Sequence, residues 1–138
     1  MTHDPAPRII SINPPELGTP PGYSQIVEVS ANRMIFIAGQ TALDSDGNLV
    51  GKEDFAAQAA QVFCNLAVAL QASGCTPANL AKLTVFLTDM NHLASYREAR
   101  NRFFASVTPP AAPAVTLVEV SKLYGPDFLI EIEAIAAA

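Results

Sequence analysis

Few side chains in this 138-residue chain could do acid–base chemistry, and the most suggestive are Glu131 and Glu133. Because side chains alternate along a strand, these two carboxylates share one face of the predicted last strand. A carboxyl group with a raised pKa at such a place can orient an attacking water molecule. Alternatively, backbone amides or cations at a contact between subunits satisfy the pair, and the pattern alone favours this structural interpretation.

Other residues that commonly carry chemistry lack the spacing that such sites need. The chain has no Gly-rich phosphate loop, no GxSxG elbow, no CxxC and no His pair at ligand spacing. His3 lies in the predicted tail, and His92 starts a predicted helix, where solvent exposure is more common than catalysis. Cys64 and Cys75 are interpreted as reduced, incidental thiols. In Asp44–Asn48 the glycine comes too early for a calcium loop, so we predict a turn and no metal site.

Composition and charge narrow the class of protein. Half of the residues are hydrophobic and 15% are charged, which excludes a disordered chain. The net charge of −5 provides no basic surface for nucleic acid or for an anionic membrane. The first residues lack the apolar segment of a signal sequence, and no apolar run approaches the length of a membrane span. We therefore expect a cytoplasmic protein with a single domain, residues 1–138, in which Met1–Pro7 form a flexible tail.

Hydrophobic periodicity and turn residues predict the secondary structure. The alternating or β-branched segments expected to form strands are Arg8–Ile12, Ile26–Val29, Met34–Ala38 and Leu80–Thr88, with two more strands inside Pro113–Ala136. Apolar residues at three- and four-residue steps predict helices over Phe55–Ser73 and Leu93–Phe104. Asp54 is a plausible N-cap of the first helix, and Gly74 a plausible stop. The order β-β-β-α-β-α-β-β predicts an α+β protein with two helices on one face of a six-stranded sheet.

The C-terminal segment decides what the other face of that sheet looks like. We expect two strands joined by a short connection over residues 124–127, with side chains that alternate between two faces. The face without helices is predicted to carry Val115, Leu117, Glu131 and Glu133. An uncovered sheet face this apolar is unusual in a small monomer, so we expect a subunit contact or a cleft there.

Several short motifs, taken in order, resemble one known family. They are Tyr23-Ser24-Gln25, residues 36–40 (FIAGQ), residues 85–91 (VFLTDMN), residues 118–120 (VEV) and residues 130–136 (IEIEAIA). From about Ile9 to the C-terminus the chain is similar to the reactive intermediate deaminase family, Rid or YjgF-like. The resemblance implies a chorismate-mutase-like fold, a homotrimer whose sheets form a central barrel, and small-molecule pockets between subunits. It also implies hydrolysis of reactive enamines and imines, such as 2-aminoacrylate, to keto acid and ammonia without a cofactor.

Three residues match the family's site directly. The resemblance implies that Tyr23 forms a wall of the pocket, that Gly39 lies beside the substrate, and that Glu131 holds the attacking water.

Four other positions depart from the family's pattern. Val115 stands where the family has an arginine that grips the substrate carboxylate, and Leu117 replaces a frequent Cys or Thr. Ala38 replaces a Ser, and Arg97 replaces an Asn. Losing the arginine removes a bidentate, charge-assisted partner for a carboxylate. We therefore expect poor activity on 2-iminopropanoate. Two alternatives are open for Arg97: it reaches into the pocket and substitutes for the missing arginine, or it is a solvated arginine on the face of the helix.

Three functions remain open from the sequence. In the first, Glu131 positions water against the carbon of an imine that is neutral or anchored differently. In the second, the trimer is a non-catalytic module that binds a small ligand or partner in its apolar clefts. The third is ribonuclease activity, after the name that some relatives carry, but the acidic charge and the lack of a His pair count against it.

Overall fold

The computed structural model describes residues 6–138, and its elements follow the predicted order. The strands are β1 (Arg8–Ile12), β2 (Ile26–Ser30), β3 (Met34–Gln40), β4 (Leu80–Leu87), β5 (Ala114–Glu119) and β6 (Ile130–Ala137), and the helices are α1 (Phe55–Ala72) and α2 (Leu93–Phe104). The α+β class is therefore confirmed. His3 and most of the predicted tail lie outside the described residues.

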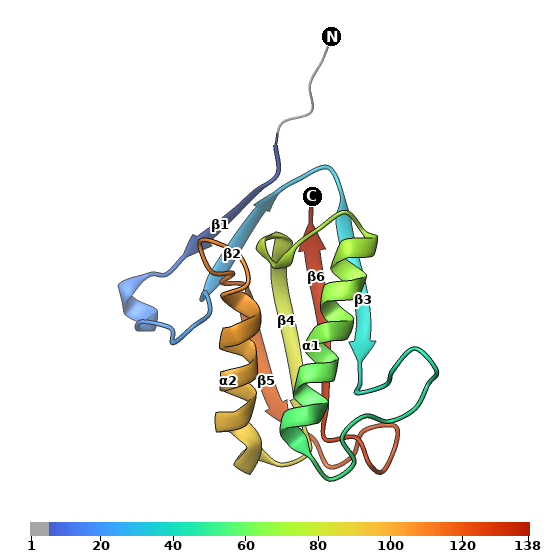
Figure 1. Ribbon diagram of the computed structural model, residues 1–138. Helices are drawn as coiled ribbons and strands as arrows, with labels where there is room; N and C mark the ends of the chain where they lie inside the picture. The colour runs from blue at the N-terminus through green and yellow to red at the C-terminus, as the bar shows by residue number, and fades with distance from the viewer. Residues whose placement is uncertain (1–5) are drawn as a thin grey trace.

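The six strands form two hydrogen-bonded sheets and not the single sheet expected. The larger sheet has the order β3-β6-β4-β5, with β4 and β5 parallel and the other neighbours antiparallel, while β1 and β2 form an antiparallel pair (Figure 1). Among residues 6–138, a single isolated bridge from Ser24, just before β2, to Ala114 links this pair to β5. Pro113 precedes this bridge and has no N–H to donate, which limits a longer ladder.

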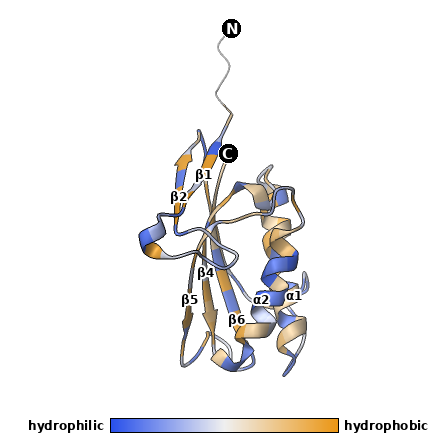
Figure 2. Cartoon of the chain, turned by 90° about the vertical axis from the view of Figure 1, so that its left-hand side faces the viewer, coloured by the Kyte–Doolittle hydropathy of each residue, from blue (hydrophilic) through white to orange (hydrophobic). Residues whose placement is uncertain are grey.

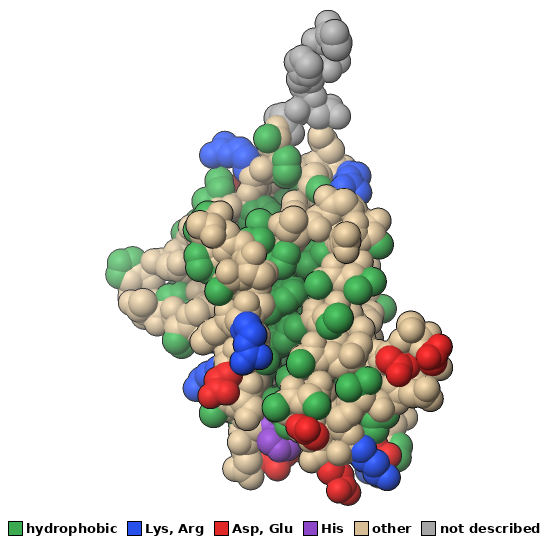
Figure 3. Space-filling view, viewed as in Figure 1, with side chains coloured by type: hydrophobic (Ala, Val, Ile, Leu, Met, Phe, Trp, Pro, Cys, Tyr) green, Lys and Arg blue, Asp and Glu red, His purple; other side chains and the backbone are tan. Residues whose placement is uncertain are grey.

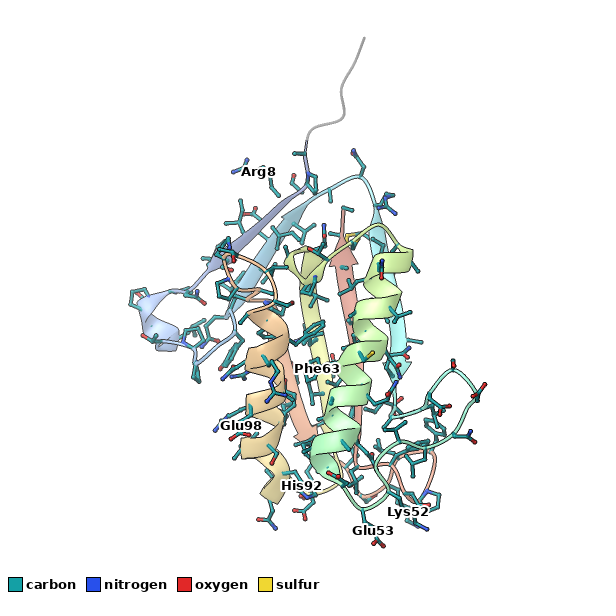
Figure 4. The ribbon with its side chains drawn as sticks, in the orientation of Figure 1. Arg8, Lys52, Glu53, Phe63, His92 and Glu98 are labelled. Atoms are coloured by element: carbon teal, nitrogen blue, oxygen red, sulfur yellow. The ribbon has the colours of Figure 1, made fainter. Side chains whose placement is uncertain are left out.

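Both helices pack on one face of the four-stranded sheet, as predicted, and Figure 2 shows them on the same side. The helix α1 begins after Asp54, whose Oδ1 accepts from the Ala57 N–H at 3.1 Å, and its C-terminal turn is followed by Gly74 at φ +73°. Phe63 of α1 meets Phe103 of α2 with ring centroids 4.9 Å apart, and Figure 4 labels Phe63 between the two helices. Hydrophobic side chains are visible along this seam in Figure 3.

One sequence-based expectation about α1 is wrong. By length and composition alone, this helix of 18 residues is long and apolar enough to cross a membrane. Its apolar stripe, however, lies in the core of the fold, and the buried Gln58 donates to the carbonyls of Gly51 and Asp127. A core helix passes the same test of length and composition.

The C-terminal strands are not the hairpin that the sequence suggested, because β4 lies between β5 and β6. Val115 and Leu117 are in register with the buried Leu83 and Val85, so they lie on the face that the helices cover. In β6, by contrast, Glu131 is in register with Phe86 and lies on the face without helices, as does Glu133. The prediction that all four residues share the uncovered face is therefore wrong.

The uncovered face combines apolar side chains with charged ones. Phe36 is 74% exposed and Met34 50%, both on β3. Next to them along the sheet lie the two glutamates of β6, and Lys82 of β4 donates to Thr116 Oγ1 at 2.6 Å. An exposed phenylalanine of this kind on a sheet face commonly marks a contact with another chain.

Candidate functional site

The helix α2 carries the polar residues of a cavity of about 320 Å³. Tyr96 and Arg100 are four residues apart and therefore lie on one side of the helix. They are only 1% and 6% exposed, and the Arg100 guanidinium carbon lies 5.8 Å from the centroid of the Tyr96 ring. Arg97 also lines the cavity but is exposed.

Strand β5 and the loop before β2 supply the facing walls of this cavity. Val115 and Leu117 come from β5, and Tyr23 comes from the loop. Met90 and Leu93 line it near the start of α2. The structure thus brings together four residues that the sequence singled out, Tyr23, Arg97, Val115 and Leu117; this cavity is called the α2 pocket below.

Arg100 fastens the loop that carries Tyr23. Its Nη2 donates to the Pro21 carbonyl at 3.2 Å and to Asn101 Oδ1 at 3.0 Å, and its Nε also donates to Asn101 Oδ1. Gly22 has φ +82°, and a Cβ there would lie 2.7 Å from Arg100 Nη2. Glycine at this position therefore lets the loop close over the guanidinium.

The Tyr96 hydroxyl is buried at the α2 pocket with no hydrogen-bond partner among the described residues. Burial raises the pKa of Tyr96 to about 12, although the positive charge of Arg100, the approach of its guanidinium to the hydroxyl oxygen and the charge of Arg97 act in the opposite direction. The hydroxyl proton itself has no acceptor among the described residues. The hydroxyl therefore stays protonated at physiological pH and is available as a donor.

The remaining predicted residues form a second group, at the end of β3 and the start of β6. A Cβ on Gly39 would overlap Oε1 of Glu131, so only glycine lets the carboxylate lie directly against the β3 backbone. Burial raises the pKa of Glu131, and the nearby negative charge of Glu133 raises it further. Ala38, next to Gly39, is exposed and lines a cavity of about 380 Å³ together with Glu133. We call Gly39 and Glu131 the Glu131 corner.

Within one chain these two groups do not meet. The α2 pocket lies on the helix-covered side at the β5 edge of the sheet, whereas the Glu131 corner lies on the other face, towards the β3 edge. The Glu131 corner also adjoins a different cavity, of about 600 Å³, which Gly39 lines together with Tyr124. There the Tyr124 hydroxyl and Thr41 Oγ1 are 2.6 Å apart.

Sequence reasoning missed Arg100 and the role of Tyr96. Neither residue was among the site residues named from the sequence. The available signal was their spacing of four residues, which puts an arginine on the buried side of an amphipathic helix.

His92 lies elsewhere, and it is not simply exposed as expected. It is half-buried just before the start of α2 (Figure 4). Its ring stacks on that of Phe55, with centroids 4.5 Å apart. It does not line the α2 pocket. Among residues 6–138, no group of three or more His, Cys, Asp or Glu side chains is arranged to hold a metal ion.

Comparison with known proteins gives consistent matches along most of the chain. A RutC family protein of Synechocystis is 40% identical over 115 residues, which are 83% of this chain and 84% of that protein. A mouse protein named 2-iminobutanoate/2-iminopropanoate deaminase is 36% identical over 90 residues, 65% of each chain. A Yersinia pestis protein of unknown function from the conserved Rid family superposes with a TM-score of 0.84 at 33% identity, covering 94% of this chain and 98% of that one.

The family model described as endoribonuclease L-PSP matches residues 16–138, which is nearly the whole chain. The protein therefore belongs to the endoribonuclease L-PSP family, whose members are also called YjgF, RutC and Rid proteins.

Proposed function

We propose that this protein hydrolyses reactive imines, and their enamine tautomers, to carbonyl compounds and ammonia. The observation that carries the proposal is the Glu131 carboxyl, which has a raised pKa and lies against the bare backbone of Gly39. A carboxyl group in this state can accept a proton from water and return it in a later step. The mouse relative named as a 2-iminobutanoate/2-iminopropanoate deaminase supports the same chemistry.

Each step of the proposed reaction uses only Glu131 and water. Ionised Glu131 takes a proton from a water molecule while the water oxygen bonds to the imine carbon. The imine nitrogen becomes an amine, and protonated Glu131 gives the proton to that nitrogen. Glu131 then takes the proton of the new hydroxyl group and passes it to the amine nitrogen. The carbon–nitrogen bond breaks, so that ammonia leaves and the hydroxyl oxygen becomes the carbonyl oxygen. One imine and one water thus yield one carbonyl compound and one ammonia, and no cofactor takes part.

The proposal includes a homotrimer with a central barrel and its ligand sites between subunits. In this assembly the Glu131 corner of one subunit faces the α2 pocket of its neighbour, which would join the two separated groups of residues. The apolar side chains on the uncovered sheet face, above all Phe36, support burial of that face between copies. Location in the cytoplasm stays a prediction.

Substrate choice is proposed to differ from that of relatives that have the strand arginine. Without an arginine at position 115, a charge-assisted pair worth ~1.5–3 kcal/mol is lost from that wall of the pocket. This corresponds to about tenfold to a few hundredfold in affinity for a carboxylate held there. A small acid such as 2-iminopropanoate is therefore expected to be a poor substrate.

The test is release of ammonia from imines that an amino-acid oxidase generates in situ from acidic, aliphatic and aromatic amino acids. Wild type is compared with Glu131→Gln, and Glu133→Gln on the same face of β6 is the matched control. We expect the Glu131→Gln variant to lose about 100-fold or more in rate, within the usual range for a general base. The control should retain most of the activity. Equal rates for wild type and Glu131→Gln would contradict the proposal.

The second candidate is a trimeric module that binds a small ligand or partner without turnover. The replacement of the family's arginine by Val115 and of Cys or Thr by Leu117 favours it, because both changes make the pocket more apolar. Wild type that releases no ammonia from any imine, while Val115→Arg does, would favour this candidate. Ribonuclease activity, which the family name suggests, has no support from a protein of net charge −5.

A further inference from the structure

Within one chain, the α2 pocket holds positive charge that no acid lining the pocket compensates. Among the described residues that line it are two arginines and two tyrosines but no Asp or Glu. Arg100 donates only to a backbone carbonyl and to an amide oxygen, both uncharged. Glu98, the acid of α2, is exposed and does not line the pocket. Since buried guanidinium groups are normally paired, a pocket with this charge balance favours an anionic ligand.

The Tyr96 hydroxyl is a second, independent observation that favours an anionic ligand. It is 1% exposed, lines the pocket and has no acceptor within residues 6–138. A buried hydroxyl without a partner costs free energy, which an acceptor atom of a ligand would remove. Because the hydroxyl stays protonated, that acceptor would be an oxygen such as a carboxylate oxygen.

The opposite wall of the pocket is apolar. Val115 and Leu117 of β5 face α2, and Leu93 and Met90 continue the apolar lining. A ligand with its anionic end at α2 therefore directs the rest of its structure towards aliphatic side chains. The cavity volume of about 320 Å³ falls within the range of small-molecule sites.

We propose that Arg97, Arg100 and the Tyr96 hydroxyl form a carboxylate anchor on α2, and that the pocket selects 2-imino acids with apolar side chains, such as those formed from leucine or phenylalanine. This inference rests on the proposed imine hydrolysis for the identity of the reacting group. The anchor occupies the helix wall, which explains how the strand wall can carry valine. Arg100 both holds the loop of Tyr23 and keeps its charge at the pocket, while the exposed Arg97 closes on the carboxylate.

The apolar wall of the α2 pocket is expected to favour ligands with larger apolar side chains. Each buried methylene adds about fourfold to affinity. The side chain of a leucine-derived acid has three more carbons than that of an alanine-derived one. We therefore expect the former to bind tens of times more tightly.

The test measures binding without turnover, by isothermal titration calorimetry. The probes are 4-methyl-2-oxopentanoate, its methyl ester as the uncharged control, and pyruvate as the small acid. The protein variants are Arg97→Gln and Tyr96→Phe, with Arg102→Gln as the matched control, because Arg102 is also exposed on α2 but lies outside the α2 pocket. Since Arg97 is exposed, its replacement is expected to leave the fold and the melting temperature unchanged.

We expect Arg97→Gln to weaken binding of 4-methyl-2-oxopentanoate about 10- to 100-fold, and Tyr96→Phe about 3- to 10-fold. Binding of the ester should be weak in wild type and change little in the variants, and Arg102→Gln should match wild type. The proposal is wrong if both pocket variants bind the acid as tightly as wild type does, if acid and ester bind equally, or if wild type binds no acid.

The same variants separate this inference from the proposed hydrolysis. Glu131→Gln should still bind the oxo acid while losing ammonia release. If the acid binds through Arg97 but wild type releases no ammonia, the anchor is correct and the proposed hydrolysis is wrong. If ammonia release depends on Glu131 but its KM does not change in Arg97→Gln, the hydrolysis is correct and the anchor is wrong.

Discussion

The α2 pocket and the Glu131 corner are built on different principles. The corner consists of a short side chain on a strand and a glycine on its neighbour, so the sheet itself fixes its geometry. The pocket depends on long side chains from a helix and on a loop that a buried arginine holds down. The sheet can therefore hold the proposed reacting group rigidly, while the residues proposed to recognise the ligand vary on the helix.

The largest expected effect comes from breaking the proposed contact between subunits, which would separate the Glu131 corner of one subunit from the α2 pocket of its neighbour. Phe36 is 74% exposed on the uncovered face, so Phe36→Glu should leave each subunit folded but place a charge in the proposed subunit contact. We expect a monomer with no detectable ammonia release. Analytical ultracentrifugation together with the ammonia assay checks this, and Leu17→Glu, at an exposed position away from both groups of residues, is the control. A Phe36→Glu trimer with full activity would contradict the proposed assembly.

The next effect concerns the corner alone. In Gly39→Ala the new methyl group would overlap the Glu131 carboxylate and displace it, and we expect a loss of about 100-fold in kcat. Binding of 4-methyl-2-oxopentanoate through α2 should be retained. The control is the double variant Gly39→Ala/Glu131→Gln, which should be no slower than Glu131→Gln alone, because both changes remove the same group. Additive losses would mean that Gly39 acts by another route.

A smaller effect should appear in the pH dependence of the reaction rate proposed for the Glu131 corner. Its reaction needs ionised Glu131, whose raised pKa moves the acid limb of the rate profile above the ordinary carboxyl range. Glu133→Gln removes a negative charge that raises this pKa, so the acid limb should move to lower pH. Profiles of kcat/KM against pH for the two proteins check this. An unchanged limb would mean that Glu133 does not influence the reacting group.

The same raised pKa has a consequence for stability. The folded protein binds the Glu131 proton more tightly than the unfolded chain does, so this group stabilises the fold at low pH and loses that contribution as pH rises through the folded pKa. Glu131→Gln should therefore increase the free energy of unfolding relative to wild type at pH 7 and not at pH 4. Urea denaturation at both pH values measures the difference.

The smallest expected effect is on the stability of the protein when no ligand occupies the α2 pocket. Tyr96→Phe removes a buried hydroxyl that lacks a partner, so the ligand-free variant should be as stable as wild type or more stable by up to about 1 kcal/mol. Urea denaturation without and with 4-methyl-2-oxopentanoate checks this. The ligand should stabilise wild type more than the variant. A clear loss of stability in the ligand-free variant would mean that the hydroxyl has a structural partner.

The sequence was sufficient for the order and the limits of most elements. Helix α2 runs from Leu93 to Phe104 as periodicity predicted, and Asp44–Asn48 is the expected turn, in which Asp44 Oδ1 accepts from the Asn48 N–H at 2.9 Å. Glu131, Tyr23 and Gly39 could be singled out because they lie in motifs that resemble the family. The family itself is confirmed.

The arrangement of the last strands could not be predicted in the same way. Alternation says which side chains of a strand share a face, but not which face it is or which strand is the neighbour. Val115 was therefore assigned to the wrong face, since nothing local indicated that β5 runs parallel to β4. Arg100 was missed for a related reason, because a helix arginine is usually solvated and its burial depends on a loop some eighty residues earlier in the chain.

The position of α2 has a consequence for how such proteins can diverge. This helix lies on the side of the sheet away from Phe36 and Glu131, so substitutions at its exposed positions change neither the face proposed for assembly nor the carboxylate proposed to react. Duplicated copies of such a chain could acquire new preferences by changing a few residues of one helix. In this architecture, we expect changes in substrate preference to accumulate in α2, and the residues proposed for the reaction to change little in β3 and β6.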